Sequence, residues 1–497
     1  MVDGAAPRYA GDRHLVVLAP TEPLWGSTNL SALAEGTLRS ALPPIAHPTI
    51  SSILKQYNAT IAPLFAAAPR TGTIGVELRA HVAAPAPSSP GIVRLYHRVI
   101  AEDRKLDEIA SALRAVPTVE AAYVKPRAEP PINRMQPSAA APAPPVQSPD
   151  FSGRQIHLGP APSGVDAQYA WAQPGGTGAG VNIIDVEGEW RLSHEDLQHN
   201  IRGLLGGTPP NDADWRNHGT AVVGVCAADR NGFGVTGICP DATIGMVSIF
   251  GSADRTSSTA IREAANLLSA GDILLIELHY PGPKNNYQNR DDQDGYIAVE
   301  WWPDDFDAIA YAVSRGVIVV EAAGNGAQNL DDALYETPDP GFPSDWKNPF
   351  RRANRDSGAI LVGAGAPPPG THNRNLYGPD RSRLDFSNFG SAVDVQGWGR
   401  EVTSCGYGDL QGGSEDRWYT DEFAGTSSAS PVVVGVIACT QGFVRAGGVA
   451  LLTPARTRSL LRATGSPQQD GLSGPATQRI GNRPDLRALL AAATSTS

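Results

Sequence analysis

The sequence predicts an α/β protein in which a parallel sheet carries helices on both faces, preceded by a small α+β domain. Strand and helix patterns alternate between residues 181 and 320, which is the order that builds a parallel sheet covered on both sides. A stretch rich in Pro, Ala and Ser, residues 127–150, has no periodicity and separates this region from a shorter one before it. The sequence therefore predicts a linker at 127–150 and a main domain over 151–497.

The composition excludes several classes of protein. Of the 497 residues 41% are hydrophobic, which is enough for a large packed core and excludes a largely disordered chain. The formal net charge of −11 argues against a nucleic-acid-binding surface, where a basic excess is expected. No window approaches the ~18 consecutive apolar residues of a membrane-spanning helix. We therefore expect neither a nucleic-acid partner nor a membrane span.

The region before the linker predicts a compact α+β unit over 71–126. Strand-like segments cover 73–82, 92–100 and 119–124. Between the last two, the apolar residues of 104–115 recur at the spacing of one helix face. The first 70 residues are rich in Pro and Ala, and their pattern gives no assignment. A helix on one face of an antiparallel sheet would bury the apolar residues of this unit.

The main domain shows seven clear elements. Short apolar runs predict strands, and apolar residues at helical spacing or in small-residue runs predict helices. The expected strands are 181–184, 243–250, 272–278 and 317–320, and the expected helices are 218–228, 259–269 and 304–314. Chemistry in such sheets gathers at the carboxyl ends of the strands, so the polar residues there are the candidates for a site.

The N-terminus and the cysteines bear on the compartment. The longest apolar run near the start, residues 15–19, is shorter than the ~7–15 residues of an export signal, which predicts a cytoplasmic protein. The four cysteines form no CxxC pair, so neither a zinc ribbon nor a dithiol site is expected. Buried free thiols are favoured, and one or two disulfides are the alternative.

Four segments carry the residue types of a nucleophilic site. Asp185 ends an apolar strand, His218 opens a small-residue helix, and Ser427 lies in a glycine turn before an apolar helix. A serine hydroxyl is a weak nucleophile until a base such as histidine takes its proton, and a carboxylate on the other ring nitrogen fixes the histidine tautomer. Asn325, after the strand 317–320, is placed to donate to a developing oxyanion together with the Ser427 N–H. Each residue alone has an ordinary explanation as a turn, core or capping residue, and their joint occurrence favours the site.

The segments around these residues resemble the signatures of the subtilisin-like serine peptidases. The order Asp, His, Ser is that of the family. GTSSASP at 425–431 resembles its nucleophile signature, NHGTAVVG at 217–224 its histidine signature, and AAGN at 322–325 the segment of its oxyanion asparagine. Supporting stretches at 194–197, 231–241 and 385–390 match as well, so the resemblance covers about residues 151–490.

The resemblance implies the fold, the activity and a proteolytic maturation step. It implies a subtilisin-like serine endopeptidase that hydrolyses protein or peptide substrates through Asp185, His218 and Ser427 and an acyl-enzyme, with no cofactor for the chemistry. It also implies that the unit at 71–126 is an inhibitory propeptide, bound to the catalytic domain and cut off by the enzyme itself within 126–150. A permanent N-terminal module is the alternative. Family members often bind structural calcium, for which the sequence identifies no ligands, and an extracellular location is the family's habit.

The sequence also departs from the family pattern. Val186, Glu187 and Gly188 follow the aspartate, where the family has Ser or Thr and then Gly. The strand expected to line the substrate channel reads Glu277, Leu278, His279 in place of Ser-Leu-Gly, so these three residues are the candidates for substrate binding. An acidic Glu277 in the cleft would favour a basic substrate side chain, whereas local hydrogen bonds to this carboxylate are the favoured alternative.

Other clusters of residues give weaker evidence for a metal or substrate site. His194, Glu195 and His199 do not have the i, i+4 histidine spacing of a zinc peptidase helix. The acidic run at 291–294 lacks an EF-hand pattern and predicts a solvated loop. Trp301 and Trp302 fit either a substrate cleft or core packing. The rival functions are a catalytically silent binding protein on the same fold and a processing peptidase dedicated to one partner protein.

Overall fold

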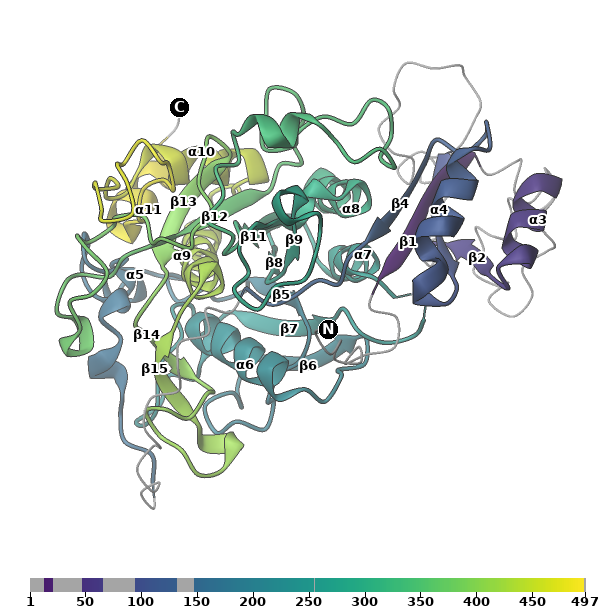
Figure 1. The fold of residues 1–497 in the computed structure, drawn as a ribbon. Coiled ribbons are helices and arrows are strands. Elements are labelled where there is room, and N and C mark those ends of the chain that lie inside the picture. Colours follow the sequence, from purple (N-terminus) through teal and green to yellow (C-terminus); the bar gives the residue numbers. More distant parts are fainter. Residues whose placement is uncertain (1–12, 21–46, 66–93, 132–146, 254, 496–497) are drawn as a thin grey trace.

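A seven-stranded parallel sheet forms the centre of the molecule, in the order β13-β12-β11-β8-β5-β7-β6 (Figure 1). The computed structural model describes residues 13–20, 47–65, 94–131, 147–253 and 255–495. The strands of this sheet are β5 (Asn182–Glu187), β6 (Ile201–Gly206), β7 (Thr243–Ser248), β8 (Ile273–Ile276), β11 (Ile318–Ala322), β12 (Ile360–Gly365) and β13 (Val393–Trp398). The predicted α/β class with a parallel sheet is confirmed.

Helices cover both faces of this sheet because alternate strand residues point to opposite sides. Ile183, Leu275 and Val320 pack on the same side as the helices α6 (Ala213–Ala227) and α9 (Thr426–Ala446). Ile184, Leu274 and Val319 pack on the other side. The helices there are α7 (Ser257–Leu267) and α8 (Pro303–Ser314), and α5 (Ala167–Trp171), α10 (Pro454–Ala463) and α11 (Leu486–Thr494) extend the α9 side. Two small ribbons, β9 (His279–Pro281) with β10 (Tyr296–Ala298) and β14 (Val402–Cys405) with β15 (Tyr419–Phe423), complete the domain.

The seven predicted elements all have counterparts, with shifted ends. The strand expected at 181–184 is β5, which continues to Glu187. The helix expected from His218 is α6, which begins at Ala213 because the side chain of Asp212 accepts hydrogen bonds from the backbone N–H groups of Asp214 (3.0 Å) and Trp215 (3.1 Å). Both shifts change which side chains meet at the site.

Helix α9 is the central element of the α6 side. It is long and apolar enough, by length and composition alone, to cross a membrane, although it contains no run of about 18 consecutive apolar residues. However, 94% of its apolar window is buried inside the protein, against the sheet and α6. This burial is what a core helix of a large domain requires, and it accounts for the apolar composition.

A small α+β unit lies beside the main domain (Figure 1). Its antiparallel sheet has the order β2-β3-β1-β4. The elements are β1 (His14–Pro20), α3 (Pro48–Gln56), β2 (Thr60–Pro63), β3 (Arg94–Ile100), α4 (Leu106–Arg114) and β4 (Ala121–Lys125). Strand β1 comes from the segment that the sequence left unassigned and lies inside the sheet. The strand predicted at 73–82 lies outside the described residues.

The small unit packs its sheet against α7 and α8. One face of the sheet covers α3 and α4, and the other joins the core of the main domain through Val16, Leu18, Tyr96 and Tyr123. In Figure 1 the two helices stand between the two sheets. This arrangement buries an ion cluster: Lys125 Nζ lies 2.9 Å from Asp304 Oδ2 and 2.5 Å from Asp305 Oδ2, with all three side chains inaccessible.

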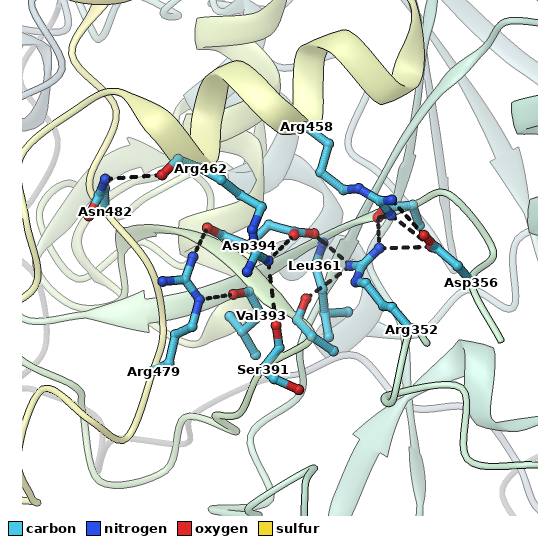
Figure 2. A network of polar contacts seen from close by, with 12 residues as sticks. Arg352, Asp356, Leu361, Ser391, Val393, Asp394, Arg458, Arg462, Arg479 and Asn482 are labelled. Carbon is cyan, nitrogen blue, oxygen red and sulfur yellow. Dashed lines mark hydrogen bonds and ion pairs between the residues drawn. The ribbon is translucent and has the colours of Figure 1, made fainter. Parts of the chain in front are cut away.

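Helix α10 is tied to the edge of the sheet by a second ion cluster (Figure 2). Asp394 on β13 is buried and lies 2.6 Å from both Arg352 and Arg462, and it also accepts the backbone N–H of Leu361 at 3.0 Å. Arg458, one turn earlier on α10, contacts the more exposed Asp356 at 2.6 Å. Three arginine side chains and one backbone N–H thus contact the carboxylates of Asp394 and Asp356. Without such partners, burying these charges would be costly.

Candidate active site

Ser427 lies at the N-terminus of α9 and is buried. Gly425 precedes the helix with a φ of +119°, a conformation that residues with a Cβ rarely adopt. A Cβ on Gly425 would lie 2.3 Å from the carbonyl oxygen of Pro131, 3.0 Å from Ser427 Oγ and 3.3 Å from Asn325 Nδ2. The missing side chain therefore leaves the space in which these three polar atoms approach one another.

His218 lies on the first turns of α6, and its ring is also buried. Nδ1 makes a very short hydrogen bond with the carboxylate of Glu187, the last residue of β5. The ring packs edge-on against Phe423, four residues before Ser427, with ring centroids 5.7 Å apart. Within the described part of the chain, no group hydrogen-bonds to Nε2, and the Ser427 hydroxyl donates to the Pro131 carbonyl in place of this nitrogen.

Asp185 does not contact His218, which corrects the role expected from the sequence. Its Oδ2 accepts the indole N–H of Trp190 at 2.8 Å. Asp185 and Glu187 share one face of β5 because they are two residues apart. Since β5 continues to Glu187, this residue stands at the carboxyl end of the strand, beside His218. The predicted strand ends at residue 184, which places Asp185 at its carboxyl end. In the structure this place belongs to Glu187, two residues later.

Burial controls the charges of the site. It raises the pKa of Glu187 well above its usual value and lowers that of His218 to about 3. The pKa of Asp185 is raised by burial and further by the neighbouring Glu187 carboxylate. While the site is covered, the imidazole is therefore neutral at pH 7, which is the state in which Nε2 can take up a proton.

Asn325 lies directly after β11 in a fixed orientation. Its Oδ1 accepts the Thr426 N–H at 2.9 Å and the Thr426 hydroxyl at 3.0 Å. Its backbone N–H donates to His279 Nδ1 at 3.3 Å. Its amide nitrogen Nδ2 donates to Gln293 Oε1 at 3.3 Å. Both Nδ2 and the Pro131 carbonyl oxygen lie close to the position that a Cβ on Gly425 would occupy.

The start of the linker runs through the site as an extended segment. The N–H of Glu129 donates to the carbonyl of His279 at 3.1 Å, and the N–H of His279 donates back to the carbonyl of Glu129 at 3.0 Å. Two residues later, Ser427 Oγ donates to the carbonyl oxygen of Pro131 at 2.8 Å. The segment thus pairs with His279 through one antiparallel bridge, and two residues later it places a carbonyl at the serine.

The three residues expected to bind substrate have different surroundings. The backbone of His279 pairs with the linker, as described above. The carboxylate of Glu277 is buried and accepts the Ser430 hydroxyl at 2.5 Å, which is the local hydrogen bond favoured as its alternative explanation. The side chain of Leu278 belongs to the core on the α7 and α8 side. His279 is thus the residue whose hydrogen bonds with the linker segment support a role in substrate binding.

One acidic group invites the question of a structural cation. Carboxylate oxygens of Asp409, Asp421 and Glu422 lie within 4.8 Å of one another. Arg374 contacts both Asp421 (3.2 Å) and Glu422 (2.7 Å), and Arg154 also pairs with Asp421. Guanidinium groups already balance these charges, so the residues fit a calcium ion poorly.

Several other sequence features are placed outside the site. Trp301 and Trp302 are buried in the core, where Trp302 stacks with Tyr123 at 5.9 Å. The acidic run at 291–294 is mostly exposed, and Asp292 and Asp294 pair with Arg290 and Lys284. All four cysteines are buried and free.

Three residues that the structure places at the site are not among the candidates that the sequence indicates. Glu187 appears in the sequence as a departure from the family pattern. It lies two residues after Asp185, on the same face of the strand, and this spacing could have identified it as the partner of His218. Pro131 lies within the linker predicted at 127–150, where no sequence pattern distinguishes it from its neighbours. Gln293, whose Nε2 donates to the carbonyl of Pro130 at 3.0 Å, carries no sequence signal, because only the folded loop brings it to the cleft.

A buried serine at a helix N-terminus, a histidine paired with a carboxylate and an oriented asparagine are the residue types of a nucleophilic hydrolase, and here they are carried by a parallel α/β sheet and its helices. The profile of the Subtilase family matches residues 163–481, and the chain belongs to this family of serine peptidases. Subtilases need no chemical cofactor.

Individual relatives agree with this assignment. The chain is 30% identical to M-protease of Shouchella clausii (strain KSM-K16) over 269 residues, which cover 53% of this chain and 54% of that protein. It is 29% identical to Subtilisin BL of Lederbergia lenta, covering 53% and 76%. The chain thus spans about half the length of the first of these relatives. The crystal structure of fervidolysin from Fervidobacterium pennivorans, a keratinolytic enzyme related to subtilisin, superposes with a TM-score of 0.52 at 17% identity, covering 98% of this chain and 62% of that one, which shows the shared fold.

Proposed function

We propose that this chain is a serine endopeptidase that hydrolyses peptide bonds through Glu187, His218 and Ser427. The observation that carries the proposal is the 2.8 Å contact between Ser427 Oγ and the carbonyl oxygen of Pro131, in a segment bound as an extended strand. A carbonyl held at a buried nucleophile is the arrangement that precedes acyl transfer.

The residues divide the reaction as follows. Ser427 Oγ attacks the carbonyl carbon while His218 Nε2 takes its proton, and Glu187 holds Nδ1 and stabilises the imidazolium that forms. Negative charge develops on the carbonyl oxygen, where Asn325 Nδ2 and the backbone N–H of Ser427 are available as donors. His218 then protonates the leaving amine. Water, activated by the same imidazole, hydrolyses the acyl-enzyme and restores Ser427.

The same geometry supports self-processing at the bond between Pro131 and Ile132. The small N-terminal unit is anchored on α7 and α8 through Lys125, six residues before Pro131, so its chain leads directly into the cleft. Until that bond is cut, the segment blocks other substrates. The N-terminal unit therefore acts as an intramolecular inhibitor, and the intact chain is a zymogen.

The test is the intact mass of the purified wild type beside Ser427→Ala. We expect the wild type to lose residues 1–131 of its 497, about 14 kDa of 52.2 kDa, and the variant to stay whole. A fluorophosphonate probe should label the processed wild type at Ser427 and leave the variant unlabelled. If neither cleavage nor labelling occurs in the wild type, the catalytically silent binding protein becomes the better account.

A further inference from the structure

Two residues of the β9–β10 ribbon and its loop contact both the bound linker segment and Asn325. The backbone of His279 pairs with Glu129, and His279 Nδ1 accepts the backbone N–H of Asn325 at 3.3 Å. The side-chain amide of Gln293 does the same with its two ends. Nε2 donates to the Pro130 carbonyl at 3.0 Å, and Oε1 accepts from Asn325 Nδ2 at 3.3 Å. The ribbon and its loop therefore touch the segment and the oxyanion donor of the proposed mechanism at the same time.

The partners of Gln293 fix the orientation of its amide. The backbone N–H of Thr426 can only donate, so the atom of Asn325 that it contacts is Oδ1, and the atom that faces Gln293 is Nδ2. Because the Pro130 carbonyl can only accept, Nε2 of Gln293 faces the segment and Oε1 faces Asn325. Gln293 is 7% exposed, so both hydrogen bonds lie in a poorly hydrated environment, where they are stronger than in water.

The contact with Gln293 leaves Asn325 a hydrogen for the oxyanion. Nδ2 carries two hydrogens, and Gln293 Oε1 accepts one of them. At the other end of the amide, Oδ1 is held by the N–H and the hydroxyl of Thr426, at 2.9 and 3.0 Å. Contacts at both ends set the rotation of the amide plane, and with it the direction of the second N–H. A donor fixed in this way needs no reorganisation when charge develops on the attacked carbonyl.

The backbone of Gln293 is held in a conformation that residues with a side chain seldom adopt. Its φ is +54°, its N–H donates to the Arg290 carbonyl at 3.1 Å, and its carbonyl accepts the Tyr296 N–H at 3.1 Å. Tyr296 begins β10, and its ring packs on that of His279 with ring centroids 4.7 Å apart. Left-handed backbone in such a residue is costly and is kept where the neighbouring structure demands it. The loop therefore presents the Gln293 amide from a fixed position.

We infer that Gln293 is a positioning residue of the peptidase. It holds Asn325 in the orientation that binds the oxyanion, through the same amide that binds the substrate carbonyl before the attacked one. The inference rests on the proposed peptidase function and adds a requirement on the substrate: the nitrogen of the attacked residue must carry an acyl carbonyl, as it does inside a peptide segment.

A double-mutant cycle on kcat tests whether Gln293 acts through Asn325. The proteins are the wild type, Gln293→Ala, Asn325→Ala and the double variant, each incubated until its intact mass shows complete self-cleavage. The substrate is a quenched fluorescent peptide that copies residues 128–133, and kcat is counted per site that a fluorophosphonate labels. We expect Gln293→Ala to lower kcat about tenfold in the wild type, the effect of roughly one hydrogen bond, and less than about twofold in Asn325→Ala. The exposed Gln288→Ala in the same loop is the matched control and should keep the wild-type kcat.

A second peptide tests the contact with the substrate and can be used on the wild type alone. In this peptide the carbonyl oxygen just before the attacked residue is replaced by sulfur, which is a weak hydrogen-bond acceptor. We expect the kcat/KM of the wild type to be about threefold to tenfold lower on this thioamide peptide than on the ordinary one. Gln293→Ala, which has no donor to lose, should cleave the two peptides at rates within about twofold of each other.

The outcomes separate the positioning role from the peptidase function. An equal loss of kcat with and without the Asn325 side chain would mean that Gln293 acts independently of Asn325. Equal cleavage of the two peptides by the wild type would mean that Gln293 does not bind the substrate carbonyl during the reaction. Either result overturns the inference and leaves the peptidase function standing. A wild type that neither cuts itself and the peptide nor reacts with the fluorophosphonate refutes the peptidase function itself.

Discussion

The imidazole of His218 is hydrogen-bonded through Nδ1 to the carboxylate of Glu187, at the carboxyl end of β5. Asp185, two residues earlier on the same strand face, is instead bonded to Trp190. The strand thus offers two buried carboxylates, and only the second reaches the histidine. In the proposed mechanism, Glu187 is therefore the acid that supports His218.

Replacing Glu187 should therefore cost far more activity than replacing Asp185. Glu187→Gln keeps the shape but removes the charge that fixes the His218 tautomer, so we expect kcat to fall by about 10⁴. Asp185→Asn keeps an acceptor for Trp190 and should lower kcat by less than about tenfold, because Asp185 touches no reacting group.

Peptide hydrolysis by the two variants, with thermal unfolding as the folding control, measures this difference. The reverse order of effects, with Asp185→Asn nearly inactive, would restore Asp185 as the catalytic acid.

Removing the side chain of Asn325 should act on turnover. Asn325→Ala deletes the oxyanion donor, and loss of one such donor lowers kcat by about 10²–10³ with a small change in KM. The exposed Asn329→Ala is the control and should keep wild-type turnover. Steady-state kinetics on one peptide give both constants. A large rise in KM with unchanged kcat would mean that Asn325 binds substrate without stabilising the transition state.

The ion cluster beneath the N-terminal unit should make stability depend on pH. Burial raises the pKa of Asp305 from 3.8 to about 7, although Lys125 opposes the shift. Between about pH 4 and 7, Asp305 therefore keeps a proton in the folded chain that it has lost in the unfolded chain. Its contribution to the free energy of unfolding is full below pH 4 and is lost as the pH rises to 7.

Urea unfolding of Ser427→Ala, which cannot cut itself, measures this effect. We expect the free energy of unfolding to fall by about 1–3 kcal/mol more between pH 5 and 8 than it does when Asp305→Asn is added. Identical pH profiles of the two proteins would contradict the assignment of the proton to Asp305.

The cluster around Asp394 should contribute much more to stability than the neighbouring exposed pair. Asp394→Asn leaves Arg352 and Arg462 without their buried counter-charge, and we expect a loss of about 3 kcal/mol. Asp356→Asn removes a partly exposed pair of the same helix and should cost less than about 1 kcal/mol. Urea unfolding of both variants at pH 7 in the Ser427→Ala background checks the order. Equal losses would show that burial adds nothing at Asp394.

The sequence by itself determined the sheet class, the family and three of the site residues. Alternation of buried strands and helices predicted the parallel sheet, and the glycine turn before an apolar helix located Ser427. His218 and Asn325 followed in the same way, because local motifs fix the backbone that carries these side chains. The Pro-rich composition also predicted the linker, although not which of its residues contacts Ser427.

Only the tertiary structure shows that Glu187 pairs with His218, that the Pro131 carbonyl lies at Ser427 and that Gln293 contacts Asn325. Asp185 and Glu187 share one strand face, so the choice between them depends on where β5 ends relative to α6. Pro131 and Gln293 meet the site across more than a hundred residues of sequence separation from Ser427. Strand β1 joins the sheet of the small unit from a segment whose short apolar run, 15–19, did not by itself predict a strand. Local patterns record which face of an element is buried, whereas contacts between distant elements arise only when the sheets and helices pack together.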